Sequence, residues 1–338
     1  MTKSLLALFL LLCSSADANP EKNGWLREKV KSRWIQKQSA LAAPTASNDV
    51  TSKITKAGDL VFSFKHDSVM RYYRVHIPKA YNPAQATPLV LALHGAGGDM
   101  NYPAEGDNYR LIAKSESAGF ILVLPNGSSH FKSGKFAAWN AGACCAYARD
   151  KQTNDVDFLR EVIRNVKNQL NIDSNKVFAT GMSNGAMMSY RLACEMPETI
   201  KAIAPVAGTD NTLVCDPKNG TPVLHIHARN DESVLFGGGA GPSSVDKALV
   251  TDYKSVPATI EKWRTINKCR PTTKKILEKD GAFCELTTDC KSGAAVQLCV
   301  TESGGHTWPG SLKPGRRGEA PSTALSATDL MWDFFSTR

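Results

Sequence analysis

The sequence predicts an α/β fold built around a mostly parallel sheet with helices on both faces, and three observations support this. Continuous apolar runs of strand length occupy 88–95 and 119–127, as in strands buried on both sides. Between the strand-like runs lie segments of helical periodicity, of which 155–170 is the clearest. Glycines directly follow several of the apolar runs. Alternation of this kind is typical of strands joined by helices that cover a central sheet.

The expected elements follow one another along a single body, residues 58–338. A strand at 70–78 ends at a proline and precedes the two buried strands. The amphipathic helix 155–170 has an acidic start, and either Asn154 or Asp155 can cap it. The other expected elements are strands at 175–181, 200–208, 221–231 and 295–305, and a closing helix at 322–335.

The N-terminus differs from this body. A lysine precedes a short apolar run at 5–12, and small residues at 16 and 18 fit a signal-peptidase site. We therefore expect residues 1–18 to be a signal peptide, followed by a basic helix and a linker at 19–57. The apolar run is shorter than the ~20 residues of a membrane span, so no transmembrane segment is expected.

Charge and cysteines narrow the class of protein. The formal net charge is +9 among 338 residues, which indicates a basic surface or attraction to an acidic polymer. Basic blocks interleaved with aromatic residues are missing, so nucleic-acid binding is not expected.

Cleavage of a signal peptide would remove Cys13 and leave eight cysteines. An even count in an exported chain predicts disulfides, and the lack of C-x-x-C pairs argues against a metal site. Cys284 and Cys299 are candidates to join neighbouring strands. The adjacent Cys144 and Cys145 can bridge each other or, as we favour, fix one loop at two places.

A candidate nucleophile follows the strand at 175–181. The motif Gly181–Gly185 places Ser183 between two glycines at a junction of strand and helix, where a sharp turn presents a serine and the next N–H faces its substrate. The N–H of Asn184 is therefore a candidate oxyanion donor. The glycine-rich loop after the strand at 88–95 supplies a second donor, which we place at Ala96, with Gly97 as the next choice.

Serine needs a base, and the base needs an orienting acid. Asp231 follows a later strand, with Glu232 as the alternate and Asp210 as a weaker rival. His306 is the one histidine on the C-terminal side of Asp231, which gives the chain order serine, acid, histidine. Two other histidines lie within the preceding strand, where we expect them to be packed or surface imidazoles: His225 and His227.

Together these motifs resemble the secreted esterase family that contains polyhydroxybutyrate depolymerases and the feruloyl and acetylxylan esterases of carbohydrate esterase family 1. The resemblance covers roughly 58–336 and rests on five segments: His94–Gly98, Gly181–Gly185, Gly304–Gly310, 138–148 and 155–159. It implies an α/β-hydrolase fold, a catalytic domain at 58–338 and a triad of Ser183, Asp231 and His306. It implies no metal and no cofactor.

The resemblance also implies hydrolysis of carboxylic esters by a secreted monomer. We expect Trp139 and Trp308 to flank the site and to stack on substrate, or else to serve as packing residues. The first expectation for the substrate is an oligomeric or polymeric polyester. The alternatives are plant polysaccharide esters, transfer of the acyl group to another alcohol, peptide hydrolysis, and binding without catalysis.

Overall fold

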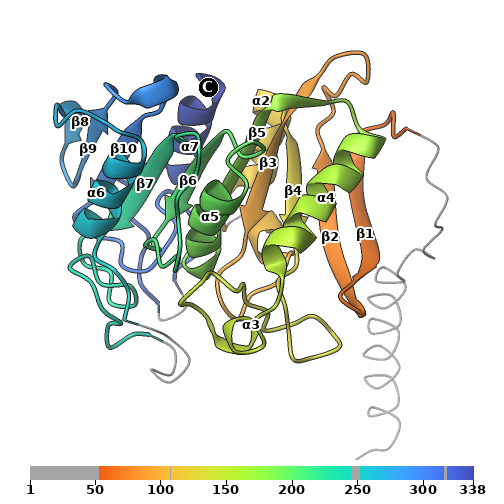
Figure 1. The fold of residues 1–338 in the computed structure, drawn as a ribbon, viewed down its shortest axis with the longest axis horizontal. Coiled ribbons are helices and arrows are strands. Elements are labelled where there is room, and N and C mark those ends of the chain that lie inside the picture. Colours follow the sequence, from red (N-terminus) through yellow and green to blue (C-terminus); the bar gives the residue numbers. More distant parts are fainter. Residues whose placement is uncertain (1–52, 107, 245–251, 316–317) are drawn as a thin grey trace, which may run out of the picture. The chain divides into compact units, whose positions relative to one another are not determined.

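One ten-stranded sheet organises the computed structural model, which describes residues 53–106, 108–244, 252–315 and 318–338. The strand order is β1-β2-β4-β3-β5-β6-β7-β10-β9-β8, and Figure 1 shows the sheet running through the middle of the body. The strands are β1 (Gly58–His66), β2 (Val69–Ile77), β3 (Thr87–Leu93), β4 (Ile121–Pro125), β5 (Ile172–Met182), β6 (Ala202–Val206), β7 (Val223–Ala228), β8 (Lys274–Lys279), β9 (Ala282–Thr287) and β10 (Val296–Thr301).

The centre of the sheet is parallel and its two margins are antiparallel. From β4 to β10 each neighbouring pair is parallel, whereas β1, β2, β9 and β8 pair antiparallel. The central strands carry the continuous apolar runs, because both of their faces are covered. Strands β1 and β8 were not predicted from the sequence, and β9 was anticipated only as a strand carrying Cys284, without bounds. The β8 strand reads KKILEK and is mostly exposed, so it lacks the apolar signal of a buried strand.

Helices cover both faces of the sheet, as predicted. On one face α4 (Asp155–Gln169), α5 (Asn184–Glu195) and α6 (Val256–Ile266) contribute to one apolar core. On the other face α2 (Leu111–Ala118) and α7 (Ala327–Ser336) contribute to a second core, and Figure 1 shows this division. The short elements are α3 (Ala146–Asp150), η1 (Tyr102–Ala104) and η3 (Lys291–Gly293).

The cap of α4 is Asn154, whose side chain accepts the Asp157 N–H. The rival cap, Asp155, is fully buried and has a different role. Its carboxylate accepts the N–H of Asn140 at 2.8 Å and the hydroxyl of Thr153 at 2.8 Å, and it pairs with Arg71 at 2.8 Å. Asp155 therefore anchors the loop around residue 140 to the start of α4 and to β2.

Four cysteine pairs join the part of the chain that the structure describes: Cys144–Cys145, Cys194–Cys215, Cys269–Cys290 and Cys284–Cys299. The pairing of Cys284 with Cys299 is confirmed, since the two residues face each other across β9 and β10. The expectation for the adjacent cysteines was wrong. They pair with each other, so they do not fix the loop at two separate places.

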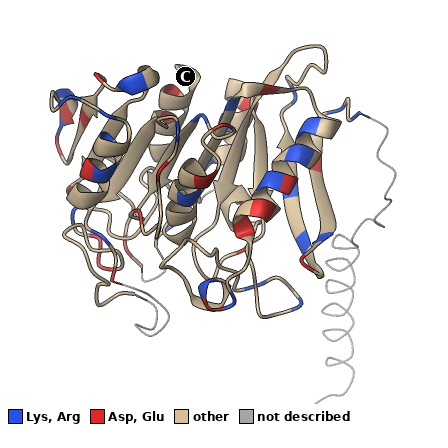
Figure 2. Ribbon diagram, in the orientation of Figure 1, with Lys and Arg blue, Asp and Glu red and all other residues tan. Residues whose placement is uncertain are grey.

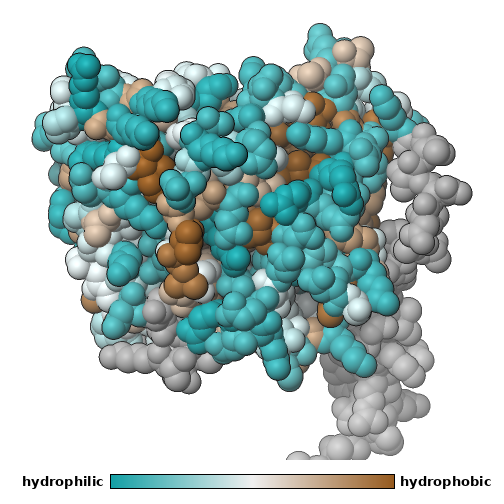
Figure 3. Space-filling model, in the orientation of Figure 1, coloured by the Kyte–Doolittle hydropathy of each residue, from teal (hydrophilic) through white to brown (hydrophobic). Residues whose placement is uncertain are grey.

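The predicted signal peptide and the predicted N-terminal helix and linker up to residue 52 lie outside the described residues. Within the described ranges, no helix combines the length and apolar character that crossing a membrane requires. Basic and acidic residues alternate along α4, α5 and α6 (Figure 2). The face that these helices form is largely hydrophilic, with separate small apolar spots (Figure 3).

Candidate active site

Ser183 lies on a strained turn between β5 and α5. Its backbone has φ 57° and ψ −122°, a conformation that costs free energy and is concentrated at functional sites. The Ser183 N–H donates to Val206 O at 2.9 Å, which fixes the turn against β6. A Cβ on Gly181 would lie 2.6 Å from Leu93 O, and Gly185 is crowded by the same carbonyl. Both glycines are therefore needed for the turn to pack against β3.

Two backbone N–H groups are placed to stabilise negative charge near this serine. Asn184 is the first residue of α5, where an N–H has no partner within the helix. In the loop after β3, the N–H of Gly97 donates to Ala137 O at 2.8 Å. In this part of the chain no hydrogen bond takes up the Ala96 N–H, which favours Ala96 over Gly97 as the second donor.

Trp139 links the two donor segments from below the surface. Its indole N–H donates to His94 O at 2.9 Å, beside the loop that carries Ala96. Its backbone N–H donates to Asn184 Oδ1 at 2.7 Å, and its carbonyl accepts from Asn184 Nδ2 at 2.9 Å. The buried Trp139 therefore fixes the relative positions of the two segments that carry the candidate donors, Ala96 and Asn184.

His94 fixes the same loop through both ring nitrogens. Nδ1 donates to Gly95 O at 2.8 Å, and Nε2 accepts the Gly127 N–H at 2.9 Å. Burial lowers the pKa of His94 to about 4, although the hydrogen bond to Gly95 acts in the opposite direction. The ring is therefore neutral near pH 7, as these two hydrogen bonds require.

Asp231 and His306 lie together at the carboxyl end of the sheet. His306 Nδ1 is 2.8 Å from Asp231 Oδ2, and the other carboxylate oxygen accepts the N–H groups of Ser233 at 2.8 Å and Val234 at 2.9 Å. Burial raises the pKa of Asp231, but His306, His227 and the Val234 N–H together bring it below the ordinary value. The carboxylate is therefore charged and can orient the imidazole.

The two rival acids occupy other positions. Asp210 is buried, with Lys262 Nζ at 2.9 Å and the Trp263 indole N–H at 2.9 Å from its Oδ2. Glu232 is exposed, and its carboxylate accepts the Ser243 hydroxyl at 3.2 Å. Of these three acids, Asp231 is the one hydrogen-bonded to His306.

The reactive atoms of the candidate nucleophile and base have no other partners. Among the described residues, no hydrogen bond occupies Ser183 Oγ or His306 Nε2, and none joins them. His306 retains 18% of its side-chain exposure, and Asp231 beside it has none. Such hydrogen bonds are often long before substrate binds. The arrangement presents an unengaged hydroxyl and an oriented imidazole at one edge of the sheet.

The structure supports the second of the two roles expected for the tryptophans, packing in the interior, and not stacking on substrate. Trp139 is fully buried and Trp308 is 2% exposed. The Trp308 ring stacks on Tyr109 with centroids 4.3 Å apart, and its N–H donates to Thr328 Oγ1 at 2.9 Å. Both rings are interior packing residues with satisfied N–H groups, so neither presents a face to a ligand.

Exposed aromatic side chains occur instead on the loop that packs against the oxyanion segment. Phe131 is 54% and Phe136 is 64% exposed, with ring centroids 5.8 Å apart. Phe136 immediately precedes Ala137, which forms a backbone bridge with Gly98. Sequence reasoning missed this pair, and the available signal was two phenylalanines flanked by lysines in a loop with no apolar periodicity.

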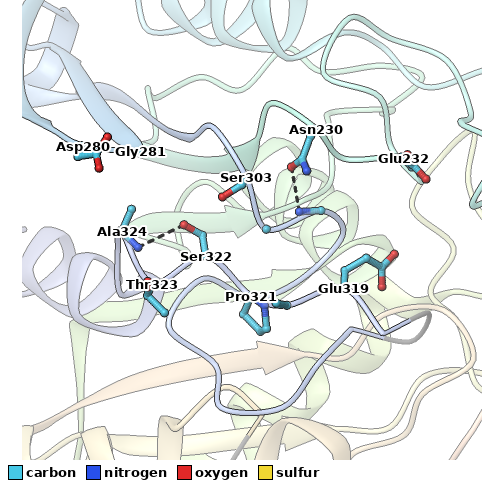
Figure 4. Close-up of a pocket in the computed structure, with 13 residues that line it drawn as sticks. Asn230, Glu232, Asp280, Gly281, Ser303, Glu319, Pro321, Ser322, Thr323 and Ala324 are labelled. Atoms are coloured by element: carbon cyan, nitrogen blue, oxygen red, sulfur yellow. Dashed lines mark hydrogen bonds between the residues drawn. The ribbon is translucent and has the colours of Figure 1, made fainter.

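A cavity of about 650 Å³ opens beside the His306 loop (Figure 4). Asn230 contributes to its wall and accepts the Gly305 N–H at 3.0 Å, directly before His306. Glu232 and Glu319 lie at one side of the cavity and Asp280 at the other. The cavity is therefore polar and acidic. Over the described ranges, no cluster of three or more His, Cys, Asp or Glu could hold a metal ion.

Known proteins similar to this chain are esterases. The chain is 27% identical over 237 residues to feruloyl esterase B of Piromyces equi, which covers 69% of this chain but 42% of that protein. It is 28% identical to a probable feruloyl esterase C of Aspergillus niger, covering 69% of this chain and 80% of that protein. The match to the Piromyces protein thus spans less than half of that relative's length.

A solved structure supports the fold. Acetyl xylan esterase from Aspergillus awamori superposes with a TM-score of 0.54 at 15% identity, over 82% of this chain and 100% of that chain. The fold is therefore that of the α/β-hydrolase esterases. Residues 72–236, which include Ser183 and Asp231, match the model described as esterase PHB depolymerase. This segment is just under half of the chain, and through it the chain is similar to the PHB depolymerase esterases.

Proposed function

We propose that this protein is a serine esterase that hydrolyses carboxylic esters with Ser183, His306 and Asp231. The observation that carries the proposal is the pairing of His306 Nδ1 with Asp231 Oδ2 at 2.8 Å, while Nε2 stays unengaged at the edge of the sheet where Ser183 turns. An imidazole held in this way accepts a proton at Nε2 and is stabilised as imidazolium by the carboxylate.

Hydrolysis proceeds in two steps. Ser183 Oγ attacks the ester carbonyl carbon while its proton passes to His306 Nε2, and the same proton then leaves on the alcohol as the ester C–O bond breaks. Water next attacks the acyl-serine, gives a proton to His306 and releases the acid when Ser183 regains it. The N–H groups of Asn184 and Ala96 stabilise the oxyanion in both steps, each contributing about 3 kcal/mol.

The alcohol portion of the substrate is expected on the His306 side, because His306 protonates that leaving group. The cavity there has Asn230, Glu232 and Asp280 on its wall, and carboxylates and amides accept hydrogen bonds from hydroxyl groups. This lining favours the second candidate function, a feruloyl or acetylxylan esterase acting on plant polysaccharide esters, over the polyester of the sequence-based expectation. The feruloyl and acetylxylan activities of the relatives agree with this choice.

The test is hydrolysis of a substrate panel by wild type and Ser183→Ala. The panel contains p-nitrophenyl acetate and butyrate, methyl ferulate, acetylated xylan and 3-hydroxybutyrate oligomers. We expect Ser183→Ala to lose at least about 10³-fold in kcat on every ester that wild type hydrolyses. A folded wild type that is inert on all of them, or an unaffected Ser183→Ala, would contradict the proposal. Greater kcat/KM on xylan or ferulate esters than on the oligomers supports the second candidate.

We further propose that the esterase acts outside the cytoplasm as a monomer. Support comes from the paired cysteines, since disulfides persist in oxidising compartments, and from the signal-peptide pattern at 1–18. Fractionation of cells expressing the full chain, combined with sedimentation of the purified protein, tests both statements. Protein retained in the cytoplasm, or a dimer at micromolar concentration, would contradict them.

A further inference from the structure

A chain of buried polar side chains runs from α5 to the carboxylate that orients His306. The Tyr190 hydroxyl is 2.7 Å from His225 Nδ1, and His225 Nε2 is 3.1 Å from His227 Nδ1. His227 Nε2 lies 2.8 Å from Val234 O and 3.4 Å from Asp231 Oδ2. His225 and His227 are two residues apart in the fully buried strand β7, so both rings lie on the same face of the sheet.

The hydrogen positions in this series of side chains can be assigned by starting from His227. A carbonyl only accepts, so His227 Nε2 carries the hydrogen that bonds to Val234 O. In the neutral ring His227 Nδ1 is then an acceptor, and the donor opposite it is His225 Nε2–H. His225 Nδ1 in turn accepts from the Tyr190 hydroxyl. Every donor therefore points toward Asp231, and no buried proton conflicts with another.

Both rings are held neutral, as this assignment requires. Burial lowers the pKa of His225 far below its ordinary value, and the neighbouring His227 lowers it further. Burial also lowers the pKa of His227, while Asp231 and Val234 O oppose this shift and His306 adds to it. The other titratable groups acting on the chain are Asp210, which faces Tyr190, and Tyr253, which faces Asp231.

His227, the last member of this hydrogen-bonded series, fixes the turn that carries the Asp231 carboxylate. His227 holds Val234 through its carbonyl, and the Val234 N–H holds Asp231 Oδ1 at 2.9 Å. The same His227 N–H faces Oδ2, the oxygen that His306 uses. We propose that Tyr190, His225 and His227 are positioning residues that hold the 231–234 turn and so keep the Asp231 carboxylate aligned with His306. This inference rests on the proposed triad.

The experiment compares His227→Phe with His227→Gln. Phenylalanine keeps the ring stacked on His225 but has no N–H, whereas the glutamine amide supplies a donor near the position of Nε2. We expect His227→Phe to lower kcat for p-nitrophenyl acetate by about 10- to 100-fold with KM changed less than about twofold, since small displacements of catalytic groups cost this much. We expect His227→Gln to recover most of that loss. A folded His227→Phe with wild-type kcat would overturn the proposal.

A measurement without substrate separates this inference from the esterase assignment. In ¹⁵N-histidine NMR spectra of wild type, we expect His225 and His227 to show the neutral Nε2–H tautomer throughout pH 5–8. In His227→Gln the low-field Nδ1–H signal of His306 should persist, whereas it should broaden or shift in His227→Phe and, to a smaller extent, in Tyr190→Phe, which removes the hydroxyl donor to His225. An Nδ1–H tautomer or a protonated ring in wild type would overturn the proposal even if His227→Phe does not fold. An inert wild type with the expected spectra would instead contradict only the esterase function.

Discussion

The two halves of the candidate site are built from different interactions. On the oxyanion side, His94, Trp139 and Asn184 are at most 1% exposed and are joined by hydrogen bonds between neutral groups. On the acid–base side, a charged Asp231 pairs with His306, which is 18% exposed beside a polar cavity. In the proposed reaction the backbone donors must stay fixed, whereas His306 must gain and lose a proton. The interior therefore holds the fixed half, and the titrating half borders solvent.

The largest effect is expected where the acid–base side loses its charge. Asp231→Asn keeps the size of the side chain but cannot stabilise the imidazolium, and it favours the wrong tautomer of His306. We expect kcat to fall by about 10⁴-fold, the order found for the same change in the serine protease triad. Steady-state hydrolysis of p-nitrophenyl acetate measures this loss.

Glu232→Gln is the matched control, since Glu232 is the exposed neighbouring acid. Its kcat for p-nitrophenyl acetate, which has no sugar hydroxyls for the cavity to bind, should stay within about threefold of wild type, because exposed charges are screened by solvent. Equal losses of kcat in the two variants would show that the carboxylate at 231 has no special role. The acid–base side would then not depend on a charged Asp231.

A substitution on the oxyanion side should lower kcat less than Asp231→Asn does, because losing one hydrogen bond displaces an oxyanion donor without removing it. Trp139→Phe keeps a large buried ring but loses the N–H that bonds to His94 O at 2.9 Å. We expect kcat to fall about tenfold with little change in KM, because the oxyanion is formed only in the transition state.

Trp308→Phe provides the control for this substitution. It also removes one indole hydrogen bond from a buried ring, but this bond goes to Thr328 and not to a donor segment. It should cost about 1–2 kcal/mol of stability, as does Trp139→Phe, yet leave kcat unchanged. A similar loss of kcat in both variants would mean that Trp139 acts through general stability alone.

The same contrast explains what the sequence could predict. The elbow around Ser183 is a local feature, with glycines at short spacing as its signal. The candidate acid and histidine were instead predicted from chain order and from their places after later strands. The bond between His306 and Asp231 joins residues on loops after different strands, and its distance could not be read from either loop.

Burial was harder to predict than position. Trp139 and Trp308 occupy loops, where aromatic residues are often exposed, but the structure folds these loops inward over the cores. Strand β8 was missed for the opposite reason, because it has an exposed polar sequence at the sheet margin. The histidines of β7 were expected to be either packed or surface imidazoles, and the structure buries both. No local pattern revealed that they form a hydrogen-bonded series leading to Asp231.

The oxyanion side, which is built from neutral groups, should make the free energy of unfolding depend on pH. The folded pKa of His94 is about 4, against an ordinary 6.5, so the unfolded chain takes up this proton first as the pH falls. Stability contributed by the neutral ring is therefore complete above about pH 6.5 and is lost progressively toward pH 4, by about 3 kcal/mol. His225 and His227 act in the same direction. The depressed pKa of Asp231 adds a loss at still lower pH.

Urea unfolding between pH 7.5 and 4.5 measures this dependence. His94→Gln removes one titrating group, so its free energy of unfolding should fall less steeply with pH than that of wild type. A wild-type free energy that is flat across this range, or an equal slope in His94→Gln, would show that His94 is not held neutral by the fold.

The smallest effect on activity is expected from the disulfide behind the acid–base side. Cys284 and Cys299 join β9 to β10 across 15 residues of sequence, and β10 leads into the His306 loop. Replacing both with serine should lower the free energy of unfolding by about 3 kcal/mol, through the loss of a constraint on the unfolded chain. At 25 °C kcat should stay within about twofold, because β10 is also paired with β7, and that parallel pairing fixes the strand end from which His306 projects. A loss of kcat in the double variant, with Cys194 and Cys215 intact, would mean that the disulfide itself sets the position of His306, and the titrating half would then depend on covalent as well as hydrogen-bonded support.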